Sequence, residues 1–134
     1  MAESKIWQSL KPALEKMFGD DYHGMRVENT AGVGQPDINI CIEGIDIWIE
    51  SKERRGNVIK IRPSQIAWIQ KRSRAGGAVY IMVLHNDTVA LYNGNQARLL
   101  TDPATVDKAK KLASINRPFK WSHIIEQMRT DIPF

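Results

Sequence analysis

Residues 36–52 read PDINICIEGIDIWIESK and carry the pattern that most restricts how this chain can fold. Isoleucine recurs at every second position on either side of the pair Glu43-Gly44, at positions 38, 40, 42, 45, 47 and 49. Alternation with a period of two on both sides of a short turn predicts a β-hairpin. In a hairpin that is symmetric about this turn, all six isoleucines lie on one face, which must be the core face.

The same register sets the charges on the other face of the hairpin. It places Asp37 across from Glu50, and Lys52 follows two residues farther along the second strand on the same side. Carboxylates opposed at about 5 Å repel each other, which raises one pKa or attracts a cation. Hard oxygen ligands of this kind suit Mg²⁺ or Mn²⁺. Geometry alone leaves a second interpretation open, in which the acids and Lys52 form an ordinary charged surface.

The rest of the chain predicts a single α/β domain in which helices flank a mixed central β-sheet. We expect helices over the N-terminal segment up to Gly19, over 63–75, over 102–114 and after Trp121, with Pro12 kinking or restarting the first. We expect strands over 78–84, which is apolar throughout and should be buried on both faces, and over 88–92 and 97–100. The domain then spans 1–134, with a core over about 4–100 and a C-terminal helical extension over about 101–134.

Composition narrows the class of protein. A chain of 134 residues with 43% hydrophobic and 25% charged residues is typical of one globular domain. Its single cysteine, Cys41, excludes an intramolecular disulfide and favours a reducing, cytoplasmic location. No segment has the length of a membrane span or the apolar core of a signal peptide. A small phage or mobile-element origin would also fit so compact a chain.

The basic residues are concentrated in one segment. Between Ser51 and Arg74 the only acid is Glu53, and there are eight basic residues: Lys52, Arg54, Arg55, Lys60, Arg62, Lys71, Arg72 and Arg74. Such a run is either a solvated face or a surface for the phosphate backbone of DNA. We expect DNA contacts from five of them: Arg54, Arg55, Lys60, Arg62 and Arg72.

Pro36-Asp37, followed by Glu50-Ser51-Lys52 at the end of the next strand, resembles the signature of the PD-(D/E)XK nucleases. Within that superfamily the chain is most similar to the VRR-Nuc type and to the archaeal Holliday-junction resolvases. Gly34 just before the motif and Gln65 at the start of the following helix also fit, and the similarity covers roughly residues 12–84. The resemblance implies a restriction-endonuclease-like core.

The resemblance also implies roles for individual residues. Asp37 and Glu50 would bind Mg²⁺, with Mn²⁺ as a substitute, and the backbone carbonyl of Ser51 would be a third ligand. Lys52 would act at the scissile phosphate, and Gln65 would support the site or touch the substrate. An acid from the first helix would assist the metal shell. Glu15 is the first candidate for that role, and Glu28 is the alternative.

The predicted function is a Mg²⁺-dependent, structure-selective DNA endonuclease, with a Holliday junction as the leading substrate. Resolving a four-way junction takes two symmetric nicks, so we expect a homodimer. Its interface would use the edge of strand 88–92 or the C-terminal aromatic residues Phe119, Trp121 and Phe134. The alternatives are a flap or nicking nuclease of the VRR-Nuc type, a non-catalytic basic DNA-binding module, and a structural domain whose acids pair with Lys52.

Overall fold

A computed structural model describes residues 2–28 and 34–132, with side chains from residue 5 onward. Its centre is one six-stranded sheet in the order β1-β2-β3-β4-β5-β6. Only the β3–β4 pairing is parallel, so the sheet is mixed, as predicted. The strands are β1 (Tyr22–Arg26), β2 (Ile38–Ile42), β3 (Ile45–Glu53), β4 (Ala78–His85), β5 (Thr88–Asn93) and β6 (Lys111–Asn116).

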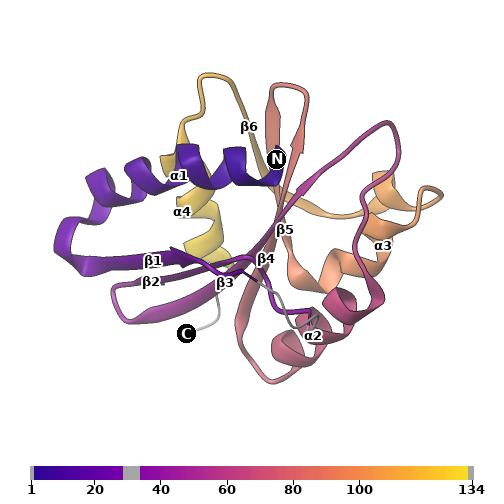
Figure 1. Cartoon of the computed structure of the whole chain (residues 1–134), viewed down its shortest axis with the longest axis horizontal. Coiled ribbons are helices and arrows are strands. Elements are labelled where there is room, and N and C mark those ends of the chain that lie inside the picture. The colour runs from indigo at the N-terminus through magenta and orange to yellow at the C-terminus, as the bar shows by residue number, and fades with distance from the viewer. Residues whose placement is uncertain (1, 29–33, 133–134) are drawn as a thin grey trace.

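Helices cover both faces of the sheet (Figure 1). They are α1 (Ala2–Phe18), α2 (Pro63–Arg74), α3 (Ala97–Thr101) and α4 (Trp121–Asp131). The hairpin isoleucines pack with α1 and α4 in a first core, whereas α2 and α3 close a second core on the opposite face. None of the described helices is long and apolar enough to cross a membrane.

The predicted hairpin register is confirmed. Ile38 pairs with Ile49, and the ladder continues through Ile40 and Ile47 to the turn. Glu43 (φ 51°) and Gly44 (φ 83°) both have positive φ, which identifies a type I′ turn. This turn twists in the same sense as the strands and therefore keeps all six isoleucines on the core side.

The parallel pair β3–β4 positions the candidate site. The chain leaves β3, crosses through α2 and returns as β4, whose residues 79–84 are all buried, as the continuous apolar run predicted. Because α2 lies in this crossover, its first turn lies near the carboxyl end of β3. That strand end carries Glu50, Ser51 and Lys52.

Two predictions about the C-terminal third are wrong. Residues 97–100 form α3, not a strand, and 102–114 contain a turn, the short η3 helix (Val106–Lys108) and the start of β6. Asp102 does not cap a long helix, because its Oδ1 accepts a hydrogen bond from the backbone N of Ala104 at 2.9 Å, which forms a local turn. Segment 101–134 is therefore not a helical extension, since β6 completes the sheet and α4 packs in the first core.

Pro12 and the expected interface also differ from prediction. Pro12 lies inside a continuous α1, because its ring is exposed while Leu10 and Leu14 on either side are fully buried.

Strand 88–92 is not a sheet edge, since β5 pairs on both sides. Trp121 is 4% exposed and its Nε1 donates to Ser9 Oγ at 2.8 Å, so it is a core residue. Phe134 lies outside the described residues.

Candidate active site

Three neighbouring segments converge on one open pocket of about 360 Å³. Strand β3 contributes Glu50, the first turn of α2 contributes Gln65, and the bend before β2 contributes Asp37. The structure thus brings together two acids and the glutamine that the motif singled out. The wall of the pocket also includes three charged side chains that lie nearby: Arg26, Glu28 and Arg62.

Gln65 connects the two candidate site residues of β3, Glu50 and Lys52. Its side chain is 5% exposed, and its Nε2 donates to Glu50 Oε2 at 3.3 Å. Its Oε1 accepts from Lys52 Nζ at 3.1 Å and from the backbone N of Arg62 at 2.9 Å. The bond from Arg62 closes the first turn of α2 as in a capping box. Gln65 is therefore held by the helix start and in turn fixes the separation of Glu50 and Lys52.

Asp37 does not face Glu50 across the hairpin as predicted. The β2–β3 ladder ends at the pair Ile38–Ile49, one residue short of Asp37. The backbone carbonyl of Asp37 instead accepts a hydrogen bond from the backbone N of Val27 at 2.6 Å, beyond the end of β1. Asp37 Oδ1 accepts from Ser51 N at 2.8 Å and its Oδ2 from Ser51 Oγ at 2.5 Å. Burial raises the pKa of the Asp37 carboxyl, against the opposing effects of the two Ser51 bonds and the Arg26 charge.

The oxygen donors of this pocket fit Mg²⁺. The described residues contain no group of three or more His, Cys, Asp and Glu side chains placed to hold a metal. Mg²⁺ needs no such group, because it commonly takes one or two carboxylates and completes its octahedron with water and substrate phosphate oxygens. Asp37 and Glu50 supply two carboxylates in one pocket, and Glu50 is only 4% exposed.

Glu15 is not part of this cluster. It is exposed on α1, pairs with Lys11 at 3.8 Å and lies near enough to Tyr22 to help raise the pKa of that phenol. Tyr22 pairs with Ile42 at the turn end of β2, and Asp37 precedes the opposite end of that strand. Glu28, the alternative acid, lines the pocket instead.

Arg26 was missed by the sequence analysis. It lies on β1 opposite Ile38, lines the pocket and acts electrostatically on Asp37. Finding it requires knowing that β1 pairs with β2, and the segment that joins these strands has no periodicity from which to predict the pairing.

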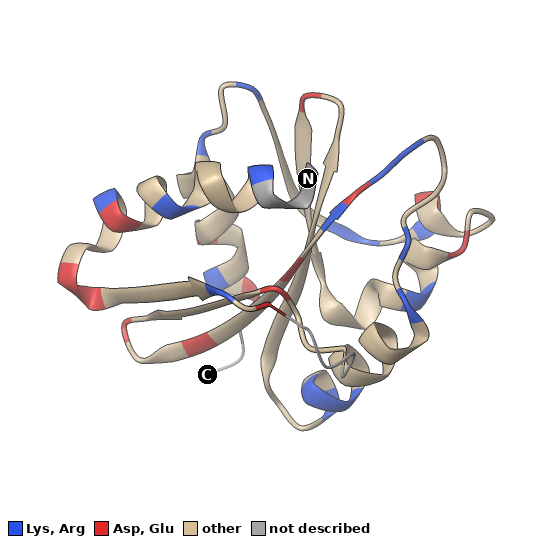
Figure 2. Ribbon diagram, viewed as in Figure 1, with Lys and Arg blue, Asp and Glu red and all other residues tan. Residues whose placement is uncertain are grey.

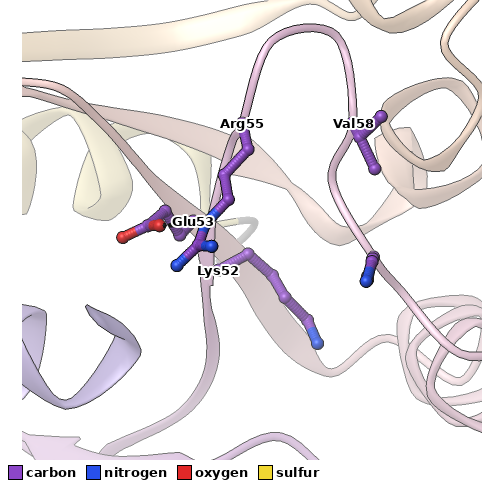
Figure 3. Close-up of a pocket in the computed structure, with 5 residues that line it drawn as sticks. Lys52, Glu53, Arg55 and Val58 are labelled. Carbon is purple, nitrogen blue, oxygen red and sulfur yellow. Dashed lines mark hydrogen bonds and ion pairs between the residues drawn. The ribbon is translucent and has the colours of Figure 1, made fainter. Parts of the chain in front are cut away.

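The five expected DNA contacts divide into two groups. Arg62 lines the pocket with Asp37 and Glu50, whereas Arg55 and Lys60 line an adjoining pocket with Lys52 (Figure 3). The other two, Arg54 and Arg72, are engaged within the fold.

Arg54 has a side chain only 16% exposed and bonds to Gly56 O, Asn57 Oδ1 and Asp107 Oδ1 at 2.7, 2.8 and 3.0 Å. Arg72 lies over the rings of Trp48 and Trp68, at 6.0 and 5.6 Å from their centroids, and bonds to Asp46 Oδ2 at 3.3 Å. Both arginines are therefore held by partners within the fold, and neither lines the pocket of Asp37 and Glu50.

The chain is similar in structure to Hjc, a Holliday junction resolvase from Archaeoglobus fulgidus, with a TM-score of 0.50 and 13% sequence identity. The match covers 84% of this chain and 88% of that chain. No protein-family model matches the sequence, and no curated protein matches it either. At this identity the likeness establishes the shared fold.

Proposed function

We propose that this chain is a Mg²⁺-dependent endonuclease that cleaves branched DNA, with the four-way junction as its leading substrate. The observation that carries the proposal is the side-chain amide of Gln65. It lies in the pocket of Asp37 and Glu50 and bonds both to Glu50 and to Lys52, which lines the adjoining pocket. The alternative interpretation, an ordinary charged surface, does not account for a buried glutamine that bonds to both an acid and a lysine. The fold shared with a junction resolvase favours a branched substrate.

The side chains present suit phosphodiester hydrolysis. Asp37, Glu50 and the backbone carbonyl of Ser51 would hold a divalent ion, and the chemistry supplied by that ion would be Lewis-acid activation of water and phosphate. Lys52 donates one of its three N–H groups to the hydrogen bond with Gln65 Oε1, so two remain to orient the attacking water or to stabilise the developing phosphate charge. Asp37 must lose its proton to act as a ligand, and its raised pKa therefore predicts that activity increases with pH in the acidic range.

The direct test is a nuclease assay with Mg²⁺ on linear, flap and four-way DNA of matched sequence. We expect the four-way junction to be cleaved fastest, and Asp37→Asn or Glu50→Gln to reduce the rate more than about 100-fold. Asp20→Asn and Glu126→Gln are matched controls, because both acids are exposed and distant in the chain from the motif. Cleavage that survives in EDTA or in both site variants would refute the proposal, and a preference for flaps would favour the nicking alternative.

We further propose that the active form is a homodimer, since one chain carries one such site and a junction needs two nicks. In the described part of the chain the outer strands of the sheet are β1 and β6, which replace β5 as candidates for the interface. Sedimentation at micromolar concentration should show a dimer, and a cruciform plasmid should be released with paired nicks in one binding event. A monomer that leaves single nicks would contradict the resolvase assignment.

A further inference from the structure

Cationic side chains surround the carboxyl end of β3 on both sides of the sheet. On one side a pocket of about 190 Å³ is lined by Lys52, Lys60, Arg55, Val58 and Glu53, and Lys52 extends into the space beside the loop after β3 (Figure 3). On the other side a pocket of about 280 Å³ is bordered by Lys5, Arg117, Arg54 and, again, Arg55 and Glu53. The shared residues make the two pockets one groove around the strand end, which we call the β3-end groove.

The β3-end groove continues the candidate active site. Lys52 lines the groove and bonds to Gln65, which lines the pocket of Asp37 and Glu50. The farther pocket is bordered by four cationic side chains and one acid, Glu53. Glu53 pairs with Arg55 at 2.6 Å, although the Arg55 side chain remains 83% exposed. Arg54 and Arg117 pair with Asp107 and Asp87, which are not among the residues that line this pocket. These cations come from segments far apart in the sequence, namely α1, the end of β3 and the chain after β6 (Figure 2).

Arg117 is fixed in position without being buried. Its Nε donates to Asp87 Oδ1 at 3.1 Å, its backbone N donates to Asp87 O at 2.9 Å, and its guanidinium lies 4.6 Å from the centroid of the Phe119 ring. Its side chain is nevertheless 49% exposed. Because the fold already restricts the guanidinium, an anion that binds there costs less side-chain entropy than at a mobile arginine.

We infer that the β3-end groove binds the phosphate backbone of the DNA arm that leaves the cleavage site, with Lys5, Arg55 and Arg117 as the phosphate contacts. This inference rests on the proposed function, because it takes DNA as the substrate. Arg54 has a structural role instead, since its bonds to Gly56, Asn57 and Asp107 hold the loop that forms the groove wall. An acidic protein partner fits less well, because Lys52 in the groove bonds to Gln65 of the pocket that would cleave a phosphodiester.

The spacing of residues along β3 indicates how far the groove lies from the candidate cleavage site. Arg54, which holds the groove wall, lies four residue steps beyond Glu50, which corresponds to about 13 Å at about 3.3 Å per residue. Duplex DNA rises about 3.4 Å per base pair, so the contacted phosphates lie about four base pairs from the scissile one. Contacts of this kind position the arm and carry no base sequence.

The test is the salt dependence of binding to a four-way junction in EDTA, where cleavage does not interfere. Lys5→Gln/Arg117→Gln should reduce the slope of log K against log salt by up to about 1.8, or about 0.9 per lost contact. Between about 50 and 200 mM salt, the wild-type protein should then lose about tenfold more affinity than the double variant. Lys11→Gln/Lys16→Gln on exposed positions of α1 is the matched control and should leave the slope unchanged.

Two further measurements complete the test. Arg117→Lys keeps the charge and should restore about half of the lost slope when combined with Lys5→Gln, which separates a phosphate contact from damage to the fold. Phosphate ethylation should show that the double variant and Arg62→Gln lose different sets of contacts, about four base pairs apart. An unchanged slope in the double variant, or a loss as large in the control, overturns the inference.

The groove and the nuclease proposal can fail separately. If the double variant loses slope while wild-type protein with Mg²⁺ cuts no DNA, the groove is supported and the proposed nuclease activity is refuted. If wild-type protein cuts junctions and the slope is unchanged, the nuclease is supported and the groove is refuted.

Discussion

Asp37 offers a sharp test of the site, because its two bonds to Ser51 predict opposite effects for two substitutions. In Asp37→Ala the backbone N and the Oγ of Ser51 lose their acceptor, and Ser51 is 1% exposed, so water cannot easily replace it. An unsatisfied buried polar group costs about 1–3 kcal/mol, which gives about 2–6 kcal/mol for the pair. For a domain of this size that is a decrease in Tm of roughly 6–30 °C.

Asp37→Asn should behave differently, because its amide can keep both bonds. The amide oxygen can accept from Ser51 N, while the amide nitrogen can donate to Ser51 Oγ, since a hydroxyl both donates and accepts. The variant also removes a carboxylate that burial disfavours. We therefore expect the Tm of Asp37→Asn in EDTA at neutral pH to equal or exceed that of the wild-type protein, although its cleavage is lost.

The pH dependence follows from the raised pKa of Asp37. Because the folded pKa lies above the unfolded one, ionisation favours the unfolded state, and this cost appears as the pH rises through the folded pKa. The advantage of Asp37→Asn over wild-type protein should thus be smallest in acid and grow towards neutrality. Ser51→Ala removes one bond that opposes the shift, so its penalty should also be larger at neutral pH than in acid.

Thermal unfolding of the four proteins in EDTA, followed by tryptophan fluorescence from about pH 4 to pH 8, measures all of these differences. The reasoning would be refuted if Asp37→Asn lost as much stability as Asp37→Ala. It would also be refuted if the difference between Asp37→Asn and wild-type protein shrank as the pH increased.

Three further predictions concern the supports of the site. Gln65→Ala should slow single-turnover cleavage about 10–100-fold while affinity for DNA in EDTA stays unchanged, and Gln70→Ala on the same helix should do neither. Gly34→Ala should lower the free energy of unfolding, measured in urea, by more than about 2 kcal/mol, because Gly34 has φ 84° and an added Cβ would overlap the backbone carbonyl of Ser64. Gly56→Ala is the control: Gly56 has φ 62° but open space around it, so the substitution should cost only about 1–2 kcal/mol. Tyr80→Phe should cost about 1–3 kcal/mol by the same measurement, since the hydroxyl donates to Asp131 Oδ2 at 2.9 Å in a buried contact between β4 and α4, and an unchanged midpoint would contradict this.

The fold could be predicted from the sequence where a long, regular residue pattern allows only one arrangement of the backbone. Six isoleucines in alternation admit a single register, and the turn at Glu43-Gly44 fixes it, so the hairpin was predictable residue by residue. Strand β6 was not, because only Ala113 and Ile115 carry its buried face, too few positions to show a period of two. The pair Asp102-Pro103 is equally common in turns and at helix starts, and tertiary context decided between them.

The candidate site also has residues whose placement could be predicted from the sequence and residues whose placement could not. Glu50, Lys52 and Gln65 lie on two consecutive elements, so their order along the chain and their spacing were enough to bring them together. The partner of Asp37 depended on where the ladder ends, a difference of one residue that no pattern encodes. Glu15 fails for a related reason, because helical spacing predicts the face of α1 but not which end of β1 its last turn approaches.

Glutamine at position 65 meets two requirements that few other side chains can meet at once. The third position of a helix favours glutamate or glutamine, because either oxygen can accept the backbone N–H at the helix start, as Gln65 Oε1 does from Arg62. Glutamate would keep this bond and the contact with Lys52 but would place a second carboxylate beside the buried Glu50, where like charges repel. The amide nitrogen instead donates to Glu50 at 3.3 Å without adding charge. The helix start and the spacing of the acid and the lysine are therefore set by one uncharged side chain.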